Sequence, residues 1–554
     1  MLRHTIAALL LGCLALPACG SSPDDGATVV GATPIPVPDP NVGADGGLPP
    51  PDGGPVESAS LDMTLGAASV AVRRGGTGSV PVTVVRTHLT SAVQLEVLGL
   101  PAGLSAPPVT VAAGATTATL SFAATPATAL GIVALKVRAT SEGLTKETAI
   151  EANVYDGEQV DPSFGTNGVV TFSTGTRAFS GISVAVLSDS KIVVGGTFDN
   201  HFSAGGPPSK PVGGFVRFLS NGDVDTAFGA AGIFVPTTAS LGGYENTPLR
   251  RVLPHGAGGF VALLEGDSTV AGNDISDALL VAFQANGAFD PAFGSGGIAK
   301  IDLGARDLAG DFTKDASGRY VVVTSDFAPT GHDAVVTRFL ANGQLDTTYG
   351  TGGRFRTQFA GKDPYGFRIA AVGDDVVIAG SRTVIGTNTI HGFIARITAT
   401  GALDATYGSA GTFDNTYQVM KLDVATDGRA YLDNKTLRRL ATGGALDPAF
   451  GSGGTAGQAA NELSFNDSVP LAAAAGRSYR LRTGHSIAGI RLLSYRNDGS
   501  VDETFGGSGA IVAAPAVNTS VDATALIFTP DHRALGLAYR FGPSGYFTLS
   551  RFLL

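Results

Sequence analysis

The chain contains no tryptophan among its 554 residues, and its only cysteines are Cys13 and Cys19. The region after residue 19 therefore offers no thiol for catalysis, no disulfide and no cysteine ligand for a metal. Charged residues make up only 15% of the chain, no basic run occurs, and the formal net charge is −10. This composition lacks the electrostatic footprint of a nucleic-acid-binding protein.

Residues with catalytic or metal-binding chemistry are also sparse. The histidines are scattered, and none has the spacing of a metal site. The stretch GHSIAG at residues 484–489 has Ala488 where the nucleophile elbow G-x-S-x-G requires its second glycine. We therefore predict no catalytic residue, no metal site and no cofactor.

The N-terminal segment predicts export. An apolar run from Thr5 to Leu16 follows Arg3 and His4, which is typical of a signal peptide. Its end, Leu16-Pro17-Ala18-Cys19, resembles a bacterial lipobox. That resemblance implies that residues 1–18 are removed, that Cys19 carries a lipid anchor, and that the protein is held in the cell envelope, at the outer membrane, on its periplasmic or surface side. The alternative is an ordinary secretory signal with a chance cysteine.

Two regions of different composition follow the signal segment. Residues 19–57 are rich in proline, glycine and aspartate and predict a disordered tether. Residues 58–155 contain about seven short runs rich in valine and threonine, which predict a β-sandwich. The stretch GLPAGL (99–104) and the alternating run TTATLSF (116–122) resemble bacterial immunoglobulin-like modules. Such modules are usually spacers and sometimes adhesive.

The remaining region, residues 156–554, is built on a repeated motif. Seven copies fit D-x-x-[F/Y]-G-x-x-G, at intervals of 43 to 65 residues. We call this the joint motif, and its defining residues are Asp161, Phe164, Gly165, Asp225, Phe228, Gly229, Asp290, Phe293, Gly294, Asp346, Tyr349, Gly350, Asp404, Tyr407, Gly408, Asp447, Phe450, Gly451, Asp502, Phe505 and Gly506.

Glycine is abundant in this chain, with 77 residues, and short strand-like runs lie between the joint motifs. In the first unit these runs are 168–172, 182–187, 191–198 and 214–219. Four locally joined strands per unit predict an antiparallel meander, and seven of them predict a seven-bladed β-propeller. The last strand, 548–553, ends where another joint motif would begin, whereas the joint motif at Asp161 has no propeller strand before it. The two ends therefore match and predict a closed ring; the alternative to a closed ring is an open solenoid. The fifth unit, at 43 residues, predicts a trimmed blade.

The period, the joint motif and the R-F/Y strand before it resemble the bacterial delta-60 repeat family over residues 161–554. The resemblance implies a propeller-like β fold. It implies little about activity, because these repeats occur mostly in envelope or secreted proteins without a described activity.

Each position of the joint motif has a structural interpretation. The aspartate accepts backbone N–H groups, the aromatic ring is buried, and the following glycine is left-handed. The competing hypothesis, seven calcium or sugar sites, is disfavoured because one carboxylate per motif is poor for calcium. An arginine precedes the aspartate by eight residues at Arg217, Arg338, Arg396 and Arg439, and Arg551 would take the same place before Asp161 only around the closed ring. Each of the five either pairs with that aspartate or faces solvent.

The candidate ligand surface consists of the variable segments before the last strand of each unit, which we expect to form loops on one face. Examples are 199–210, 265–277, 325–333 and 381–391. The candidate binding residues on it are Asp199, His201, Asp267, Asp274, Asp277, His332, Asp333 and His391. The alternative is that these are solvated loops without a ligand.

Together these features predict an all-β, non-enzymatic envelope lipoprotein with a monomeric ectodomain. It would present its propeller as a protein- or glycan-binding scaffold. The alternative is a propeller enzyme acting on polysaccharide or sugar substrates. Three acidic or histidine side chains within about 5 Å of each other in the central channel would favour the enzyme, and a channel lined by glycine and alanine would exclude it.

Overall fold

The computed structural model describes most of residues 58–554. The predicted signal peptide, the lipid-anchor residue Cys19 and the tether lie outside the described residues. Within the described part, no helix is long and apolar enough to cross a membrane. The segments between 58 and 554 that are not described are 175–177, 200–209, 271–272, 305, 329–330, 358–361, 385–388, 416–418, 420, 434–435, 457–468, 472–476, 485–486, 508, 514–521, 530–532 and 541–545.

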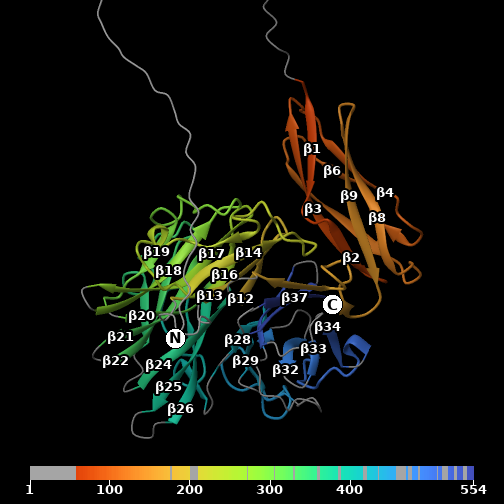
Figure 1. The fold of residues 1–554 in the computed structure, drawn as a ribbon. Coiled ribbons are helices and arrows are strands. Elements are labelled where there is room, and N and C mark those ends of the chain that lie inside the picture. The colour runs from red at the N-terminus through yellow and green to blue at the C-terminus, as the bar shows by residue number, and fades with distance from the viewer. Residues whose placement is uncertain are drawn as a thin grey trace, which may run out of the picture. The chain divides into compact units, whose positions relative to one another are not determined.

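Residues 60–155 form two β-sheets around one core, as the alternating runs predict (Figure 1). The core includes Val82, Leu120 and Phe122 from one sheet and Leu95 and Val137 from the other. Side chains alternate between buried and exposed along these strands, because each sheet has one covered face. The first sheet is β1 (Ser60–Leu65), β3 (Thr77–Thr87), β7 (Thr117–Ala124) and β5 (Leu104–Ser105); the second is β2 (Ser69–Arg73), β9 (Leu144–Tyr155), β8 (Gly131–Ser141), β4 (Val93–Leu98) and β6 (Val109–Val111).

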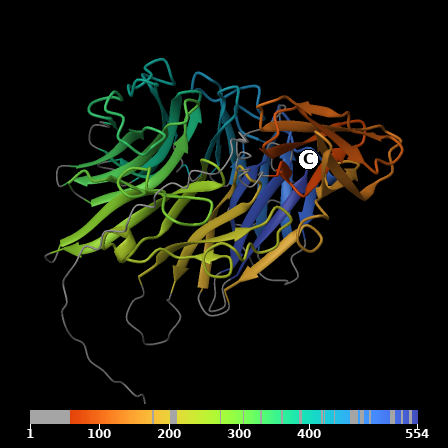
Figure 2. The ribbon, with the colours of Figure 1, turned by 90° about the horizontal axis from the view of Figure 1, so that it is seen from above.

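Residues 159–553 form a β-propeller, whose described strands make seven sheets. Seen from above, the sheets follow each other from yellow through green and teal to blue (Figure 2). In chain order the first six are β12 (Ala178–Val186), β13 (Ile192–Asp199), β14 (Val212–Phe218) and β15 (Ile233–Phe234); β16 (Leu249–His255), β17 (Gly259–Val270), β18 (Asn273–Phe283) and β19 (Ile298–Ile301); β20 (Arg306–Lys314), β21 (Tyr320–Ala328), β22 (Gly331–Phe339) and β23 (Arg354–Thr357); β24 (Lys362–Val372), β25 (Asp375–Val384), β26 (Thr389–Ile397) and β27 (Thr412–Asn415); β28 (Lys421–Val424), β29 (Ala430–Asp433) and β30 (Leu437–Leu440); and β31 (Val469–Leu471), β32 (Ser478–Gly484), β33 (Ile487–Tyr495) and β34 (Ala510–Ala513). The seventh is β35 (Asp522–Phe528), β36 (Arg533–Arg540) and β37 (Tyr546–Leu553), joined by β10 (Gln159–Val160) and β11 (Val169–Ser173).

The strand after each joint motif belongs to the preceding sheet. The prediction that each repeat forms its own four-stranded meander is wrong in this respect. Strand β15, for example, follows Asp225 but pairs with β14, which precedes it. The motif reverses the chain direction, because its glycines adopt positive φ, and the next strand therefore lies antiparallel to the last one.

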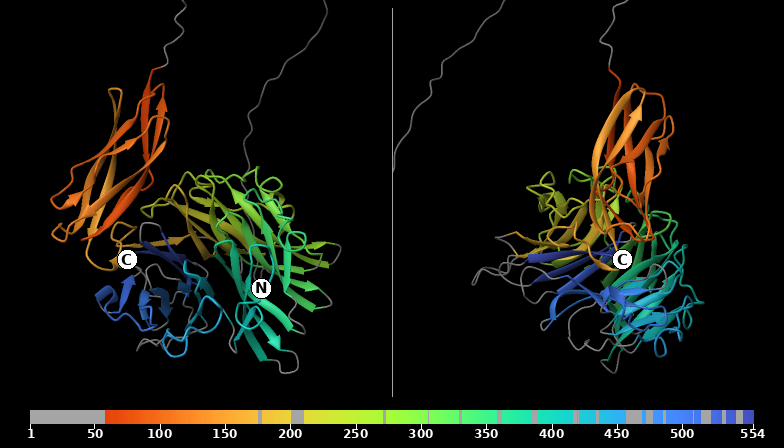
Figure 3. Two further views of the ribbon diagram at one scale, coloured as in Figure 1. Left: turned by 180° about the vertical axis from the view of Figure 1, so that it is seen from behind. Right: turned by 90° about the vertical axis from the view of Figure 1, so that its right-hand side faces the viewer.

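This offset joins the two ends of the propeller. Strand β11 pairs antiparallel with β37 in a register from Val169 opposite Ser550 to Ser173 opposite Tyr546. Figure 3 shows the blue C-terminal strands beside the yellow strands that begin the propeller. The matching ends of the sequence therefore become one sheet, which leaves no open end between the first and last repeats.

The fifth sheet has three strands among the described residues, β28, β29 and β30. A single bridge between Arg438 and Thr455 stands where the other sheets have a fourth strand. The shortened fifth unit thus forms a narrower sheet, in agreement with the trimmed blade that its length predicts.

The variable segments are largely strand, and the expectation of loops is wrong for three of them. The ladder between β17 and β18 continues to Val270 opposite Asn273, so 265–277 is a long hairpin. The same holds for β21–β22 and for β25–β26. Polar residues such as Asp267 and Ser276 continue the strand ladder here, although such residues are also common in loops. Most of the remaining segment, residues 199–210 of the first unit, lies outside the described residues.

Candidate functional site

The joint motif is held by its aspartate. In all seven copies the aspartate Oδ1 accepts the backbone N–H two residues later, at 3.0 to 3.3 Å, as in Asp161 with Ser163. This is an Asx-type turn, which the motif predicts. The glycine after the aromatic residue has φ between +53° and +62° in every copy. A Cβ there would lie 1.7 to 3.0 Å from the nearest atom, so glycine is required by both backbone and space.

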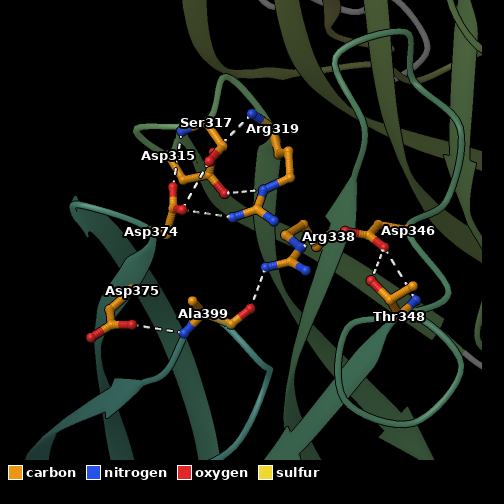
Figure 4. Close-up of polar contacts among 9 residues, drawn as sticks. All are labelled: Asp315, Ser317, Arg319, Arg338, Asp346, Thr348, Asp374, Asp375 and Ala399. Atoms are coloured by element: carbon orange, nitrogen blue, oxygen red, sulfur yellow. Dashed lines mark hydrogen bonds and ion pairs between the residues drawn. The ribbon is translucent and has the colours of Figure 1, made fainter.

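The arginine that precedes the aspartate by eight residues pairs with it, which settles the alternative left open by the sequence. The Nε–Oδ2 distance is 2.7 to 2.8 Å for Arg217, Arg338, Arg439 and Arg551, and 3.7 Å for Arg396. Figure 4 shows the contacts around Arg338, whose Nη1 donates to the Ala399 carbonyl of the next unit at 2.5 Å. Its guanidinium also lies 4.3 Å from the centre of the Tyr349 ring.

Neighbouring turns are joined by further polar contacts in the same region (Figure 4). Arg319 pairs with Asp315 at 2.7 Å and, across to the next sheet, with Asp374 at 3.4 Å. Ser317 Oγ donates to Asp374 at 2.8 Å. The joint motif and these turns therefore link neighbouring sheets through their charged groups and backbone, whereas the buried Oη atoms of Tyr349 and Tyr407 have no hydrogen-bond partner among the described residues.

Two copies lack the preceding arginine, and their aspartates have other partners. His255 Nε2 lies 3.3 Å from Asp290 Oδ2, and its Nδ1 lies 2.6 Å from Tyr320 Oη. Burial lowers the pKa of His255, against the opposing effect of Asp290. At Asp502 the cations are Arg477 and Arg496, at 3.1 and 3.0 Å. Each motif carboxylate thus has a cationic or histidine partner.

Of the candidate binding residues, the structure describes the side chains of Asp267, Asp277, Asp333 and His391. Asp267 accepts Asn246 Nδ2 at 2.6 Å. Asp333 lies 3.4 Å from Arg356, and His391 stands opposite Arg382 in the β25–β26 ladder. The side chains of Asp199, Asp274 and His332, and all of His201, lie outside the described residues. The remaining candidate, Asp277, is buried and belongs to a group of three aspartates.

That group consists of Asp277, Asp302 and Asp307, which offer oxygen atoms within 4.8 Å of one another. Such an arrangement could hold a divalent cation. However, Lys300 Nζ already lies 3.0 Å from both Asp277 and Asp302 and supplies a protein cation there. Asp307 is fully buried; burial, more than its acidic neighbours, raises its pKa to about 7.

A channel of about 1240 Å³ is lined mainly by the first strands of the propeller sheets, β12, β16, β20, β24, β28 and β35. Apolar side chains such as Leu308, Ile369 and Leu526 make up part of its wall. The charged lining is concentrated on neighbouring strands: Arg250 and Arg251 on β16, Asp311 on β20, Arg368 on β24, and Lys421 and Asp423 on β28.

A β-bulge recurs in these first strands and positions the polar side chains of the channel wall. The register shifts just before Ser183, Arg251, Asp311 and Arg368. A bulge bends a strand and re-aims the side chains that follow it. The four residues occupy equivalent places, since Ser183 Oγ accepts the N–H after Arg251 and Asp311 Oδ2 lies 3.5 Å from the N–H after Arg368.

Some of the charged side chains that line the channel form ion pairs and others do not. Both oxygens of Asp311 lie 3.2 Å from Arg251 Nη1, and Asp311 raises the pKa of Arg251. Arg250 pairs with Glu265. Burial lowers the pKa of Arg368, and the positive charges of Arg250 and Arg251 lower it further, against the effect of Asp311. The channel therefore concentrates positive charge in an acidic protein.

The sequence contains these channel residues but does not mark them. Arg251 and Asp311 lie 60 residues apart and belong to no shared motif. Aligning the first strands at their bulges would have placed Ser183, Arg251, Asp311 and Arg368 in one column, and this alignment was the available signal.

Comparison with known proteins agrees with the fold. The family described as "Domain of unknown function (DUF5122) beta-propeller" matches residues 187–228. No curated protein matches the chain.

Solved structures show only distant similarity. A quinonprotein alcohol dehydrogenase-like protein from Bacteroides thetaiotaomicron is 10% identical, with 80% of this chain and 94% of that chain covered and a TM-score of 0.24. A GH32 β-fructofuranosidase from Bombyx mori is 11% identical, with 71% and 93% covered and a TM-score of 0.27. An immunoglobulin domain complex of titin M10 and obscurin-like 1 is 17% identical, with 18% and 97% covered and a TM-score of 0.13. At these scores the likenesses carry no functional argument.

Proposed function

We propose that this chain is a non-enzymatic binding protein of the bacterial cell envelope, and that its central channel is the ligand site. The observation that supports this most is the channel itself, because a cavity of about 1240 Å³ is large enough for a small molecule or a glycan residue. Its wall combines apolar side chains with a few charged groups held by bulged strands, which is the composition of a binding site.

The other parts of the chain suit a binding domain that is held away from the membrane. We interpret the seven sheets as the blades of a seven-bladed propeller of the delta-60 type, and the sandwich as an immunoglobulin-like spacer. Lipid attachment at Cys19 would hold the protein at the outer membrane, and the tether would separate the folded part from the lipid. The ligand is a glycan or a protein segment that enters the channel.

The alternative, an enzyme acting on polysaccharide or sugar, finds little support in the channel wall. Among the described lining residues the acidic ones are Asp311 and Asp423, and none is a histidine. Asp311 is held by Arg251 and by the Phe312 N–H, at 2.9 Å, so it is poorly placed to exchange protons. The channel wall therefore lacks the group of three acidic or histidine side chains that would favour an enzyme. It is also not lined by glycine and alanine alone, which would have excluded one.

The proposal is tested by ligand capture with a blocked channel. Ala370 lines the channel, and Ala370→Trp would fill part of it. The matched control is Thr83→Trp, at an exposed position of β3 in the sandwich. Both variants and the wild type are screened on a glycan array and in pull-downs from envelope extracts. Ligands that bind the wild type and T83W but not A370W support the proposal, whereas capture that A370W leaves intact places the binding elsewhere.

A further inference from the structure

Arg368 differs from the other arginines that line the channel. Within the described residues it forms no ion pair, and its Nη1 donates to the carbonyl of the adjacent Phe367 at 2.9 Å. Arg251 and Arg250, by contrast, have the carboxylates of Asp311 and Glu265. The remaining N–H groups of Arg368 are therefore available to the cavity.

The arginines of the joint motif show how this chain satisfies a buried guanidinium elsewhere. Arg439 has the Asp447 carboxylate at 2.8 Å, the Asn497 carbonyl at 2.7 Å and the Phe450 ring centre at 4.5 Å. Arg551 has the same three kinds of partner in Asp161, Ser220 and Phe164. Among the described residues Arg368 has neither a carboxylate nor an aromatic ring as partner, and its hydrogen bond goes to the carbonyl of its own neighbour Phe367, although it too is partly buried.

The position of Arg368 is electrostatically unfavourable without a ligand. Burial penalises its charge, and Arg250 and Arg251 add repulsion, which the attraction of Asp311 offsets only in part. A desolvated charge without a partner destabilises the folded state, so stability alone does not account for an arginine here. An anion in the channel would relieve both effects, and the planar guanidinium fork matches carboxylate and phosphate oxygens.

We propose that the channel binds ligands through a carboxylate or phosphate group, which Arg368 receives beside the Arg251–Asp311 pair. This deepens the proposed function, on which it rests, by assigning the chemical class of the ligand. Leu308, Ile369 and Leu526 would contact the uncharged body of the ligand.

Isothermal titration calorimetry with the full chain tests this assignment. The probes are D-glucuronate, inorganic phosphate and the neutral sugar D-glucose, which together separate carboxylate from phosphate and charge from sugar. We expect at least one anion to bind and D-glucose to bind at least about tenfold more weakly, since one charge-assisted pair contributes that factor. Equal binding of D-glucose, or binding of neither anion, would overturn the assignment. If neither anion binds while A370W still abolishes ligand capture, the channel function stands and only the ligand class is wrong.

Variants of Arg368 supply the second arm. Arg368→Gln should weaken anion binding at least about tenfold, and Arg368→Lys, which keeps the charge but not the fork, should weaken it less. The control is Arg73→Gln, which removes the same charge from an exposed position of β2 in the sandwich and should leave binding unchanged. R368Q should also raise the urea midpoint, because it removes an unpaired cation. A lower midpoint with unchanged anion binding would make Arg368 a structural residue and overturn the assignment.

Discussion

The ion pair between Arg551 and Asp161, which joins the last repeat to the first, allows a specific prediction about stability. Arg551 on β37 lies 2.7 Å from Asp161 Oδ2, and the Asp161 side chain is fully buried. Arg551→Met would leave this carboxylate without its main partner. Removing one member of a buried ion pair costs about 3–5 kcal/mol. Arg533 remains 3.5 Å from the same oxygen, so the expected loss lies at the lower end, about 3 kcal/mol.

The same motif supplies the matched control. Arg396 is 24% exposed and lies 3.7 Å from Asp404 and 2.7 Å from Asp375. For such a partly solvated pair Arg396→Met should cost about 1 kcal/mol or less. Urea unfolding would be followed by far-ultraviolet circular dichroism and tyrosine fluorescence, since the chain has no tryptophan. Adding Asp161→Asn to R551M should recover part of the loss. An equal loss of unfolding free energy in R551M and R396M would refute the reasoning, because the burial of the ion pair would then not determine how much it stabilises the protein.

Three further predictions concern the joint motif, the acidic group and the membrane anchor. Gly294→Ala should cost about 3 kcal/mol or more of unfolding free energy, and Gly296→Ala only about 1 kcal/mol. Both glycines have positive φ, but only Gly294 lacks room for a side chain, since a Cβ there would lie 2.2 Å from the Ile298 carbonyl oxygen. Similar urea midpoints for the two variants would contradict this. Asp307 has a pKa of about 7 in the folded protein and 3.8 ordinarily, so its contribution to stability is present below about pH 4 and is lost as pH rises through 7. Asp307→Asn should therefore gain on the wild type by roughly 2 kcal/mol between about pH 5 and pH 8 in thermal unfolding, and a constant difference would count against it. Cys19→Ala should move the protein from the membrane to the soluble envelope fraction, and unchanged membrane binding would refute the lipid anchor.

The joint motif could be predicted from sequence because its determinants are local. The carboxylate of Asp447, for instance, bonds a backbone N–H two residues away, and Gly451 needs positive φ for its own turn. Local constraints of this kind leave a fixed pattern of letters. They also mark the ends of the repeats, and so predict that the first and last repeats meet, although not that β11 pairs with β37.

The ligand site could not be predicted in the same way. Arg251, Asp311 and Arg368 meet only because three separate sheets bring their first strands to the channel. Which side chain of a strand faces the channel depends on a bulge, and a shift of one residue reverses the answer. The hairpin segments were misjudged for a related reason, since the ladder between β17 and β18 extends through residues such as Asp267 and Ser276 that are also common in loops.

The central claim is that ligands enter the channel rather than the repeated joints. It is tested most directly by a crystal structure of the protein with a ligand identified on the glycan array or, failing that, with D-glucuronate. We predict ligand density between the first strands, with an oxygen within hydrogen-bond distance of the Arg368 guanidinium. Density at the joint motifs or on the sandwich, with an empty channel, would contradict the account.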